Sequence, residues 1–284
     1  MTFLSGSSGV PETVLNDGKT IPSLGFGVFL VEEGDTFGAV GSALEAGYRH
    51  IDTAAIYGNE AEVGRAVRES GVGRDDVFVT TKLWNSEQGY ESTLRAFDAS
   101  MERLGLEQLD LYLIHWPVAQ ADKYVDTFRA FQKLKAEGRV ASIGVSNFGR
   151  AELERLIAET GETPVLNQIE LSPNLIQAEL REFHAAHGIA TEAWSPLGRG
   201  AALKDSTILG IAQEVGRTPA QVIIRWHLQL GNVVIPKSVT PSRIRENFDV
   251  FGFELTEAQV NAITALDAGT RVGPNPATFT AGLL

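Results

Sequence analysis

The chain has 284 residues, of which 43% are hydrophobic, so it can bury a large core as one α/β domain. Its 36 acidic and 24 basic residues give a formal net charge of −12, which opposes non-specific binding to nucleic acid and to anionic membranes. The absence of cysteine excludes disulfides, thiolate nucleophiles and cysteine-held metal centres.

The N-terminal segment precedes the first regular element. Its Ser/Gly cluster, Ser5–Gly9, predicts a flexible leader, and the segment lacks the basic and apolar regions of a signal peptide. No run of apolar residues approaches the length of about 18 that spans a membrane, so we expect a soluble, cytoplasmic protein with no membrane partner. Asn16-Asp17-Gly18, between residues 13–15 and 19–21, then predicts a short β-hairpin.

After the hairpin, short apolar runs alternate with segments of helical periodicity. The predicted strands span residues 24–29, 50–53, 77–81, 109–115, 142–145, 166–169, 190–193 and 233–236. The predicted helices span residues 36–46, 60–70, 90–104, 124–137, 150–159, 177–187, 208–215 and 219–230. A last helix is expected after Thr240, the predicted cap residue, with Pro241 in its first turn.

This alternation predicts a parallel sheet, and eight units in about 250 residues favour a closed (β/α)8 TIM barrel. We expect residues 1–284 to form a single barrel domain, with the N-terminal hairpin at the bottom and extra helices after strand seven and at the C-terminus. The alternative is an open doubly wound sheet. Against it, Gly25-Phe26-Gly27 lacks the third glycine of a dinucleotide-binding loop.

Polar residues end seven of the eight predicted strands. Because the active site of such a barrel lies at the C-terminal ends of its strands, these residues are expected to meet at one rim. A single polar strand end would be ordinary, since strands reach water there, but seven together predict a site. The strand-end residues are Asp52, Lys82, His115, Ser146-Asn147, Asn167-Gln168, Trp194-Ser195 and Lys237.

Four of the rim residues predict an acid–base device. Tyr57, on the loop after Asp52, would donate a proton from its phenol, and the ammonium of Lys82 would lower the pKa of that phenol toward the working range. Asp52 would keep the desolvated Lys82 charged, and His115 would orient the substrate oxygen. Each also has an ordinary structural role: an ion pair for Asp52 and Lys82, a loop anchor for Tyr57, a core histidine for His115. Their joint position favours catalysis.

A carbonyl acceptor needs a hydride donor, and without cysteine or a flavin signature a nicotinamide is the simplest choice. Ser146, Asn147 and Gln168 could pair with its carboxamide, and Trp194 offers a flat face for its ring.

The phosphates of such a cofactor need positive charge on this acidic protein. Segment 236–241 leads from the last strand into a helix, and Lys237, Arg243 and Arg245 would gather at that helix N-terminus.

Three aromatic residues near the rim, Phe29, Trp84 and Trp116, are interpreted as a wall of the substrate pocket that excludes water, with simple core packing as the alternative. His184 and His187 stand three apart on one predicted helix, but no other ligand motif accompanies them, so we expect no metal site.

Seven segments make the chain resemble the aldo-keto reductase family over nearly its whole length. They are GYRHIDTAAIYGNE (47–60), TTKLWN (80–85), DLYLIHWP (110–117), GVSNF (144–148), NQIEL (167–171), WSPLGRG (194–200) and PKSVTPSRIREN (236–247). The resemblance implies a monomeric barrel that binds NADPH in an extended form without a Rossmann fold. It also implies a C-terminal loop, within 269–284, that covers a small-molecule carbonyl substrate. The wording is closest to the bacterial branch that includes the 2,5-diketo-D-gluconate reductases.

The resemblance further implies a role for each matching residue. Asp52, Tyr57, Lys82 and His115 match the catalytic tetrad, with Tyr57 as the acid. The cofactor-binding residues that it implies are Ser146, Asn147, Gln168, Trp194, Ser195, Leu197, Gly198, Lys237, Ser238, Val239, Thr240, Arg243, Glu246 and Asn247. Within this set, Lys237, Ser238 and Arg243 would take the 2′-phosphate, and Glu246 and Asn247 would contact the adenine end.

Two positions depart from the family. Trp194 stands where many members have tyrosine, and Ser172 where many have histidine. The expected reaction is NADPH-dependent reduction of an aldehyde or ketone to an alcohol. The alternatives are a non-catalytic NADPH-binding redox-sensing subunit and a barrel aldolase that uses Lys82 as a Schiff base.

Overall fold

The computed structural model of the protein describes residues 4–5 and 9–282. Eight parallel strands form one sheet, in the order β11-β10-β9-β8-β7-β6-β5-β4. The two ends of the sheet meet where Leu24 and Val234 form a parallel bridge, and the backbone N–H of Gly25 donates to Val234 at 2.9 Å. The strands are β4 (Phe26–Gly27), β5 (His50–Asp52), β6 (Phe78–Leu83), β7 (Leu109–Ile114), β8 (Val140–Ser146), β9 (Leu166–Glu170), β10 (Ala190–Trp194) and β11 (Val233–Val234).

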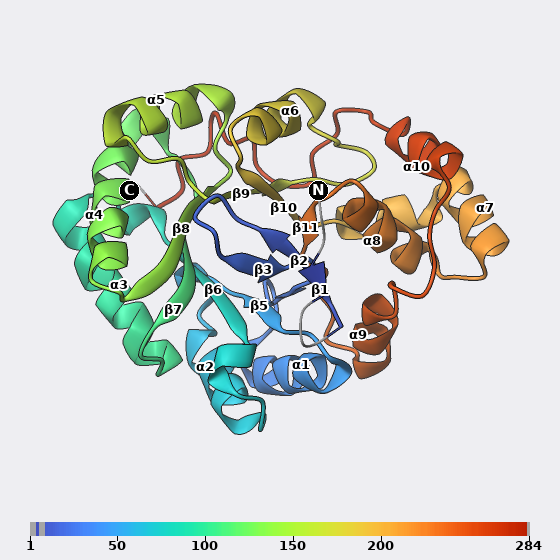
Figure 1. The fold of residues 1–284 in the computed structure, drawn as a ribbon, viewed down its shortest axis with the longest axis horizontal. Coiled ribbons are helices and arrows are strands. Elements are labelled where there is room, and N and C mark those ends of the chain that lie inside the picture. The colour runs from blue at the N-terminus through green and yellow to red at the C-terminus, as the bar shows by residue number, and fades with distance from the viewer. Residues whose placement is uncertain (1–3, 6–8, 283–284) are drawn as a thin grey trace.

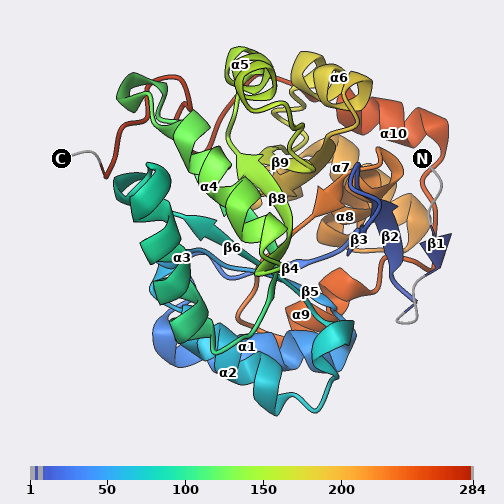
Figure 2. The same cartoon turned by 60° about the vertical axis from the view of Figure 1, so that its left-hand side comes forward.

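Helices surround this barrel on all sides (Figures 1 and 2). Six of them, α1 to α6, follow one strand each, and α7 and α8 both lie between β10 and β11, as expected for extra helix after the seventh barrel strand. The helices are α1 (Glu33–Ala46), α2 (Glu60–Glu69), α3 (Tyr90–Leu104), α4 (Tyr124–Ala136), α5 (Arg150–Thr160), α6 (Ala178–Ala186), α7 (Ser206–Val215), α8 (Pro219–Gln229), α9 (Pro241–Phe248) and α10 (Glu257–Thr264). No helix in the described residues has both the length and the apolar character needed to cross a membrane.

An antiparallel hairpin closes the bottom of the barrel. Its strands, β2 (Pro11–Val14) and β3 (Thr20–Pro22), lie in front of the barrel interior in Figure 1. Leu15 and Ile21 pack against interior side chains of the barrel strands. The predicted leader is described only in part, because residues 6–8 lie outside the described residues. The short strand β1 (Leu4–Ser5) pairs with β2 rather than forming a free leader.

Alternation along the strands divides the core into two layers. On β7, Leu111 and Leu113 point into the barrel and belong to the same apolar cluster as Leu15 and Ile21 of the hairpin. Tyr112 and Ile114 point outward against the helices. The same alternation brings polar residues of β5, β6, β9 and β10 into the barrel interior above the hairpin. The fold therefore positions these polar side chains at a shared centre.

Several element bounds differ from those predicted. The first and eighth barrel strands, predicted over 24–29 and 233–236, are each only two residues long. Pro236 has no N–H with which to continue the ladder of β11. Helix α1 begins at Glu33, ahead of the predicted start, and β9 continues to Glu170. Thr240 is the N-cap residue of α9, as predicted, but its side chain makes no capping hydrogen bond.

Candidate active site

A buried ion pair lies at the centre of the rim. Lys82 of β6 donates from Nζ to Oδ1 of Asp52 at 2.7 Å and to the backbone carbonyl of Thr53 at 2.8 Å. Both charged side chains are buried. Since Asp52 ends β5 and Lys82 stands one residue before the end of the neighbouring β6, the parallel register brings them together. The predicted pairing of Asp52 with Lys82 is thus present in the structure.

Tyr57 folds back over this pair from the 3₁₀ turn η1 (Ala55–Tyr57). The centroid of its ring lies 5.3 Å from Nζ of Lys82 and 5.7 Å from the ring centroid of His115, which directly follows β7. Its other side contacts Phe29, with 5.1 Å between ring centroids. The four predicted catalytic residues therefore lie in one cluster.

The charges in this cluster depend on burial and on the ion pair. Burial alone would lower the pKa of Lys82, but the carboxylate of Asp52 raises it above its usual value, so Lys82 stays charged. Burial raises the pKa of Tyr57, and the charge of Lys82 opposes this rise without cancelling it. As predicted, Lys82 lowers the pKa of Tyr57, but it does not bring this pKa toward the working range, because desolvation outweighs the nearby cation. Tyr57 is a protonated phenol that can act as an acid.

His115 is neutral at ordinary pH. Burial, followed by the charge of Lys82, holds its pKa well below the usual value. Its Nδ1 atom is buried with no hydrogen-bond partner among the described residues. A neutral imidazole carries one N–H, which is sufficient to donate one hydrogen bond to a substrate oxygen.

A hydrogen-bonded strip runs from β8 to β10 beside the quartet. Ser146 donates from Oγ to the backbone carbonyl of Gln168 at 2.8 Å, and Asn147 donates from Nδ2 to the backbone carbonyl of His115 at 3.0 Å. The indole N–H of Trp194 donates to Oδ1 of Asn147 at 2.9 Å. An indole has a ring N–H that the phenol of a tyrosine lacks, so at this departure from the family the extra donor fixes Trp194 to Asn147.

Gln168 lies deeper than predicted. It was expected at a strand end, but β9 runs on to Glu170, so Gln168 points into the barrel beneath the rim. Its Nε2 donates to Oδ2 of Asp52 at 2.8 Å and to Oε2 of Glu192 at 2.9 Å. Asn167 faces the other way, since its Nδ2 donates to the carbonyl of Phe148 at 2.9 Å. Gln168 is therefore part of the same buried network as the ion pair of Asp52 and Lys82.

In contrast to the buried ion pair of Asp52 and Lys82, the segment after β11 carries exposed charged side chains. Lys237 and Arg243 are exposed, and neither takes part in an ion pair within the described residues. The backbone N–H of Thr240 donates to Oγ of Ser238 at 3.1 Å, while Val239 is exposed. These features leave two cations at the N-terminal end of α9 available to an anion.

The remaining predicted cofactor residues lie on α9 and in the loop after β10. Glu246, on α9, accepts a hydrogen bond from the hydroxyl of Thr218 at 2.9 Å, and Asn247 is buried beside it. In the loop after β10, the backbone N–H of Gly198 donates to the carbonyl of Ser195 at 2.9 Å, and Leu197 is partly buried. Ser195, with a φ of 49°, has a left-handed backbone that a non-glycine residue rarely adopts.

Aromatic side chains surround the quartet. Trp84 lies with its ring centroid 5.3 Å from that of His115, and Phe29 covers Tyr57. Trp116 packs on Phe279 of the C-terminal segment at 4.3 Å, and Phe279 also contacts Trp84 at 6.4 Å. The loop was expected here from the sequence, but Phe279 was not predicted as part of the site. Its only signal was an isolated aromatic residue in a Gly/Pro-rich stretch.

Glu170 anchors this C-terminal segment. Its buried carboxylate accepts the backbone N–H groups of Val272 at 2.5 Å and Gly273 at 3.1 Å, and Arg271 lies 3.8 Å away. Figure 2 shows the chain after α10 returning past α6 and α5 toward α4. Glu170 was not predicted from the sequence either, although a charged residue directly after an apolar strand was a usable signal.

Known proteins share this architecture. The model of the Aldo/keto reductase family matches residues 24–268. An aldo-keto reductase of Mycolicibacterium smegmatis is 61% identical over 269 residues, which cover 95% of this chain and 98% of that protein. An aldo/keto reductase from Brucella melitensis is 60% identical, has a TM-score of 0.88, and is matched over 91% of this chain and 100% of its own.

A third relative was crystallised with a cofactor. A mutant of Gox0644 in complex with NADPH is 48% identical, with a TM-score of 0.92, and the match covers 95% of this chain and 99% of that chain. The family model covers most of the sequence, and the first relative is similar over almost its full length. The chain therefore belongs to the aldo/keto reductase family.

Proposed function

We propose that this protein reduces small aldehydes and ketones to alcohols with NADPH, and that Tyr57 is the proton donor. The observation that carries the proposal is the pairing of two neutral donors, Tyr57 and His115, with a buried ion pair whose charges balance. A carbonyl oxygen placed between the two donors would receive hydrogen bonds where its negative charge develops.

The residues present fit NADPH. The unpaired cations Lys237 and Arg243, with Ser238, would hold the 2′-phosphate, and Glu246 and Asn247 would contact the adenine end. Ser146, Asn147 and Gln168 would hold the nicotinamide carboxamide. Trp194 would stack on the ring, since its indole is already fixed by Asn147. When bound, NADPH supplies the hydride.

The protein supplies the proton and the orientation. As the carbonyl carbon gains a hydride, its oxygen takes the phenolic proton of Tyr57, and the resulting phenolate is stabilised by the ammonium of Lys82. Asp52 keeps that ammonium charged. The aromatic wall of Phe29, Trp84, Trp116 and Phe279 would exclude water from the reacting atoms.

We further propose that the chain works as a cytoplasmic, single-domain monomer close to the bacterial branch that includes the 2,5-diketo-D-gluconate reductases.

The test is a kinetic screen of NADPH oxidation with diketo-acids, methylglyoxal and aromatic aldehydes. We expect steady turnover with at least one class. NADPH binding without turnover would favour the redox-sensing alternative instead. A carbonyl adduct trapped on Lys82 by borohydride would favour the aldolase.

A further inference from the structure

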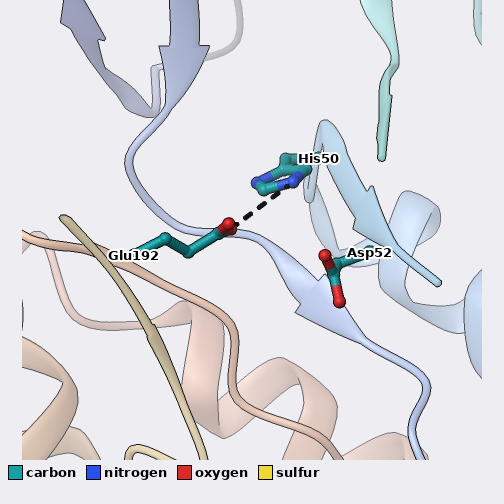
Figure 3. Close-up of side chains that lie close together, drawn as sticks. All are labelled: His50, Asp52 and Glu192. Atoms are coloured by element: carbon teal, nitrogen blue, oxygen red, sulfur yellow. Dashed lines mark ion pairs between the residues drawn. The ribbon is translucent and has the colours of Figure 1, made fainter. Parts of the chain in front are cut away.

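A second acidic side chain lies in the barrel interior next to the catalytic pair. Glu192, in the middle of β10, is fully buried, and Figure 3 shows it pointing toward His50 and Asp52 of β5. Its Oε1 lies 3.7 Å from Nε2 of His50, and its Oε2 accepts the hydrogen bond from Gln168. The proposed mechanism gives no role to this carboxyl group.

The cluster has the spacing of a metal site, but its hydrogen bonds favour a different interpretation. Ligand atoms of His50, Asp52 and Glu192 lie within 4.8 Å of one another. However, Oδ1 of Asp52 faces the ammonium of Lys82 and its Oδ2 faces the amide of Gln168. A metal ion would have to displace a cation and a hydrogen-bond donor that already satisfy this carboxylate. The prediction of no metal therefore stays a prediction, and the cluster is better described as a hydrogen-bonded network.

Few titratable groups face Glu192 among the described residues. They are His50 and Asp52 of β5, Lys82 of β6 and Tyr57 of η1, and the uncharged Gln168 of β9 donates a hydrogen bond to it. The single cation, Lys82, is already paired with Asp52, so an ionised Glu192 would be a second buried anion without a partner of its own, which is costly. Burial and the charge of Asp52 raise the pKa of Glu192 to about 8, while burial lowers the pKa of His50 to about 3. Both groups are therefore neutral at pH 7.

The hydrogen bonds also indicate which oxygen carries the proton. Oε2 of Glu192 accepts from Gln168, so the proton belongs on Oε1, which has no partner within hydrogen-bond distance and faces His50. We propose that Glu192 is a positioning residue, a neutral carboxylic acid that together with Asp52 holds both amide hydrogens of Gln168. The side-chain carbonyl oxygen of Gln168, Oε1, is then the atom left to bind the carboxamide of the cofactor, a step that rests on the proposed function.

The charge state of Glu192 can be measured without cofactor or substrate. Infrared spectra of the free protein at pH 7 should contain a protonated carboxyl band that is lost in Glu192→Gln and converts to a carboxylate band near pH 8. The matched control is Glu170→Gln, a second buried carboxyl group on the neighbouring strand β9, and this variant should keep the protonated band. If Glu192→Gln leaves the protonated band unchanged, the proposal is overturned.

Stability provides a second readout. The folded protein holds a proton on Glu192 between the ordinary pKa of 4.5 and about 8, whereas the unfolded chain releases it. The free energy of unfolding should therefore fall as pH rises through this range, and Glu192→Gln should lose that part of the slope. A role in packing alone would instead shift stability equally at every pH.

Cofactor binding tests the positioning role itself. Glu192→Leu removes the acceptor of one amide hydrogen of Gln168 and should weaken NADPH binding roughly tenfold, whereas Glu192→Gln keeps an acceptor and should bind like the wild type. Quenching of tryptophan fluorescence by NADPH measures both. If Glu192→Leu binds NADPH as tightly as the wild type, the positioning role is overturned. A wild-type protein that binds no NADPH would count against the proposed function and leave the infrared result to decide the charge of Glu192.

Discussion

The barrel interior around Asp52 and the segment that begins at Lys237 differ in whether their charged side chains are buried and paired. In the interior, Lys82, Asp52 and Gln168 are buried and joined by hydrogen bonds of 2.7–2.8 Å. Outside, Lys237 and Arg243 are exposed and unpaired within the described residues. A reaction requires groups that are fixed before the substrate arrives, whereas binding an anion requires cations whose partner is the ligand. The two regions are thus suited to different tasks.

The largest effect is expected when the interior pair is broken. Lys82→Met leaves the buried charge of Asp52 uncompensated and should lower the free energy of unfolding by about 3–5 kcal/mol, measured by urea denaturation. Turnover should be lost as well. The double variant with Asp52→Asn removes both charges and should recover much of the stability. If Lys82→Met were as stable as the wild type, the ion pair would make no contribution to the free energy of unfolding, and the prediction would be wrong.

Removing the acid should affect the reaction alone. Tyr57→Phe should lower turnover by about 10² to 10⁴, because the phenolic proton is missing, while the stability and the NADPH affinity stay close to those of the wild type. Steady-state kinetics and a fluorescence titration separate the two effects. Undiminished turnover would exclude Tyr57 from the mechanism.

Substitutions in the outer segment, which begins at Lys237, should affect the binding of NADPH. Lys237→Ala and Arg243→Ala should each weaken NADPH binding on the order of tenfold and leave NADH binding almost unchanged, because only NADPH carries the 2′-phosphate. Lys133→Ala on α4 is the matched control for removing a surface cation. Equal losses for both cofactors would contradict the 2′-phosphate assignment.

The smallest effect is expected from ionic strength, which should change cofactor binding at the outer segment but not turnover in the interior. Raising ionic strength should weaken NADPH binding a few-fold, since exposed charges are screened over about 10 Å at 0.1 M. Turnover at saturating NADPH should be insensitive, because the interior pair is shielded from solvent. A parallel fall in turnover would indicate that the interior is open to ions.

The strand-end pattern was sufficient to predict that Asp52, Lys82 and His115 lie close together. Asp52, Lys82 and His115 end or follow apolar runs, and parallel strands of a barrel must bring such positions to one rim. Tyr57 followed from its place on the loop after Asp52. The electrostatics could not be predicted as well, since the pKa of Tyr57 depends on how many atoms exclude water from its hydroxyl.

The sequence alone determined the order and type of the strands and helices, most of the residues that meet at the rim, and the family, because these are properties of short segments and their periodicity. The tertiary structure decided the contacts between distant segments. Gln168 meets Asp52 across 116 positions of the chain, and Glu192 meets His50 from the opposite part of the sheet. Phe279 and Glu170 gained their roles only once the C-terminal segment had folded over the rim. Such contacts depend on how side chains from distant strands pack inside the closed barrel, which the pattern of strands and helices does not specify.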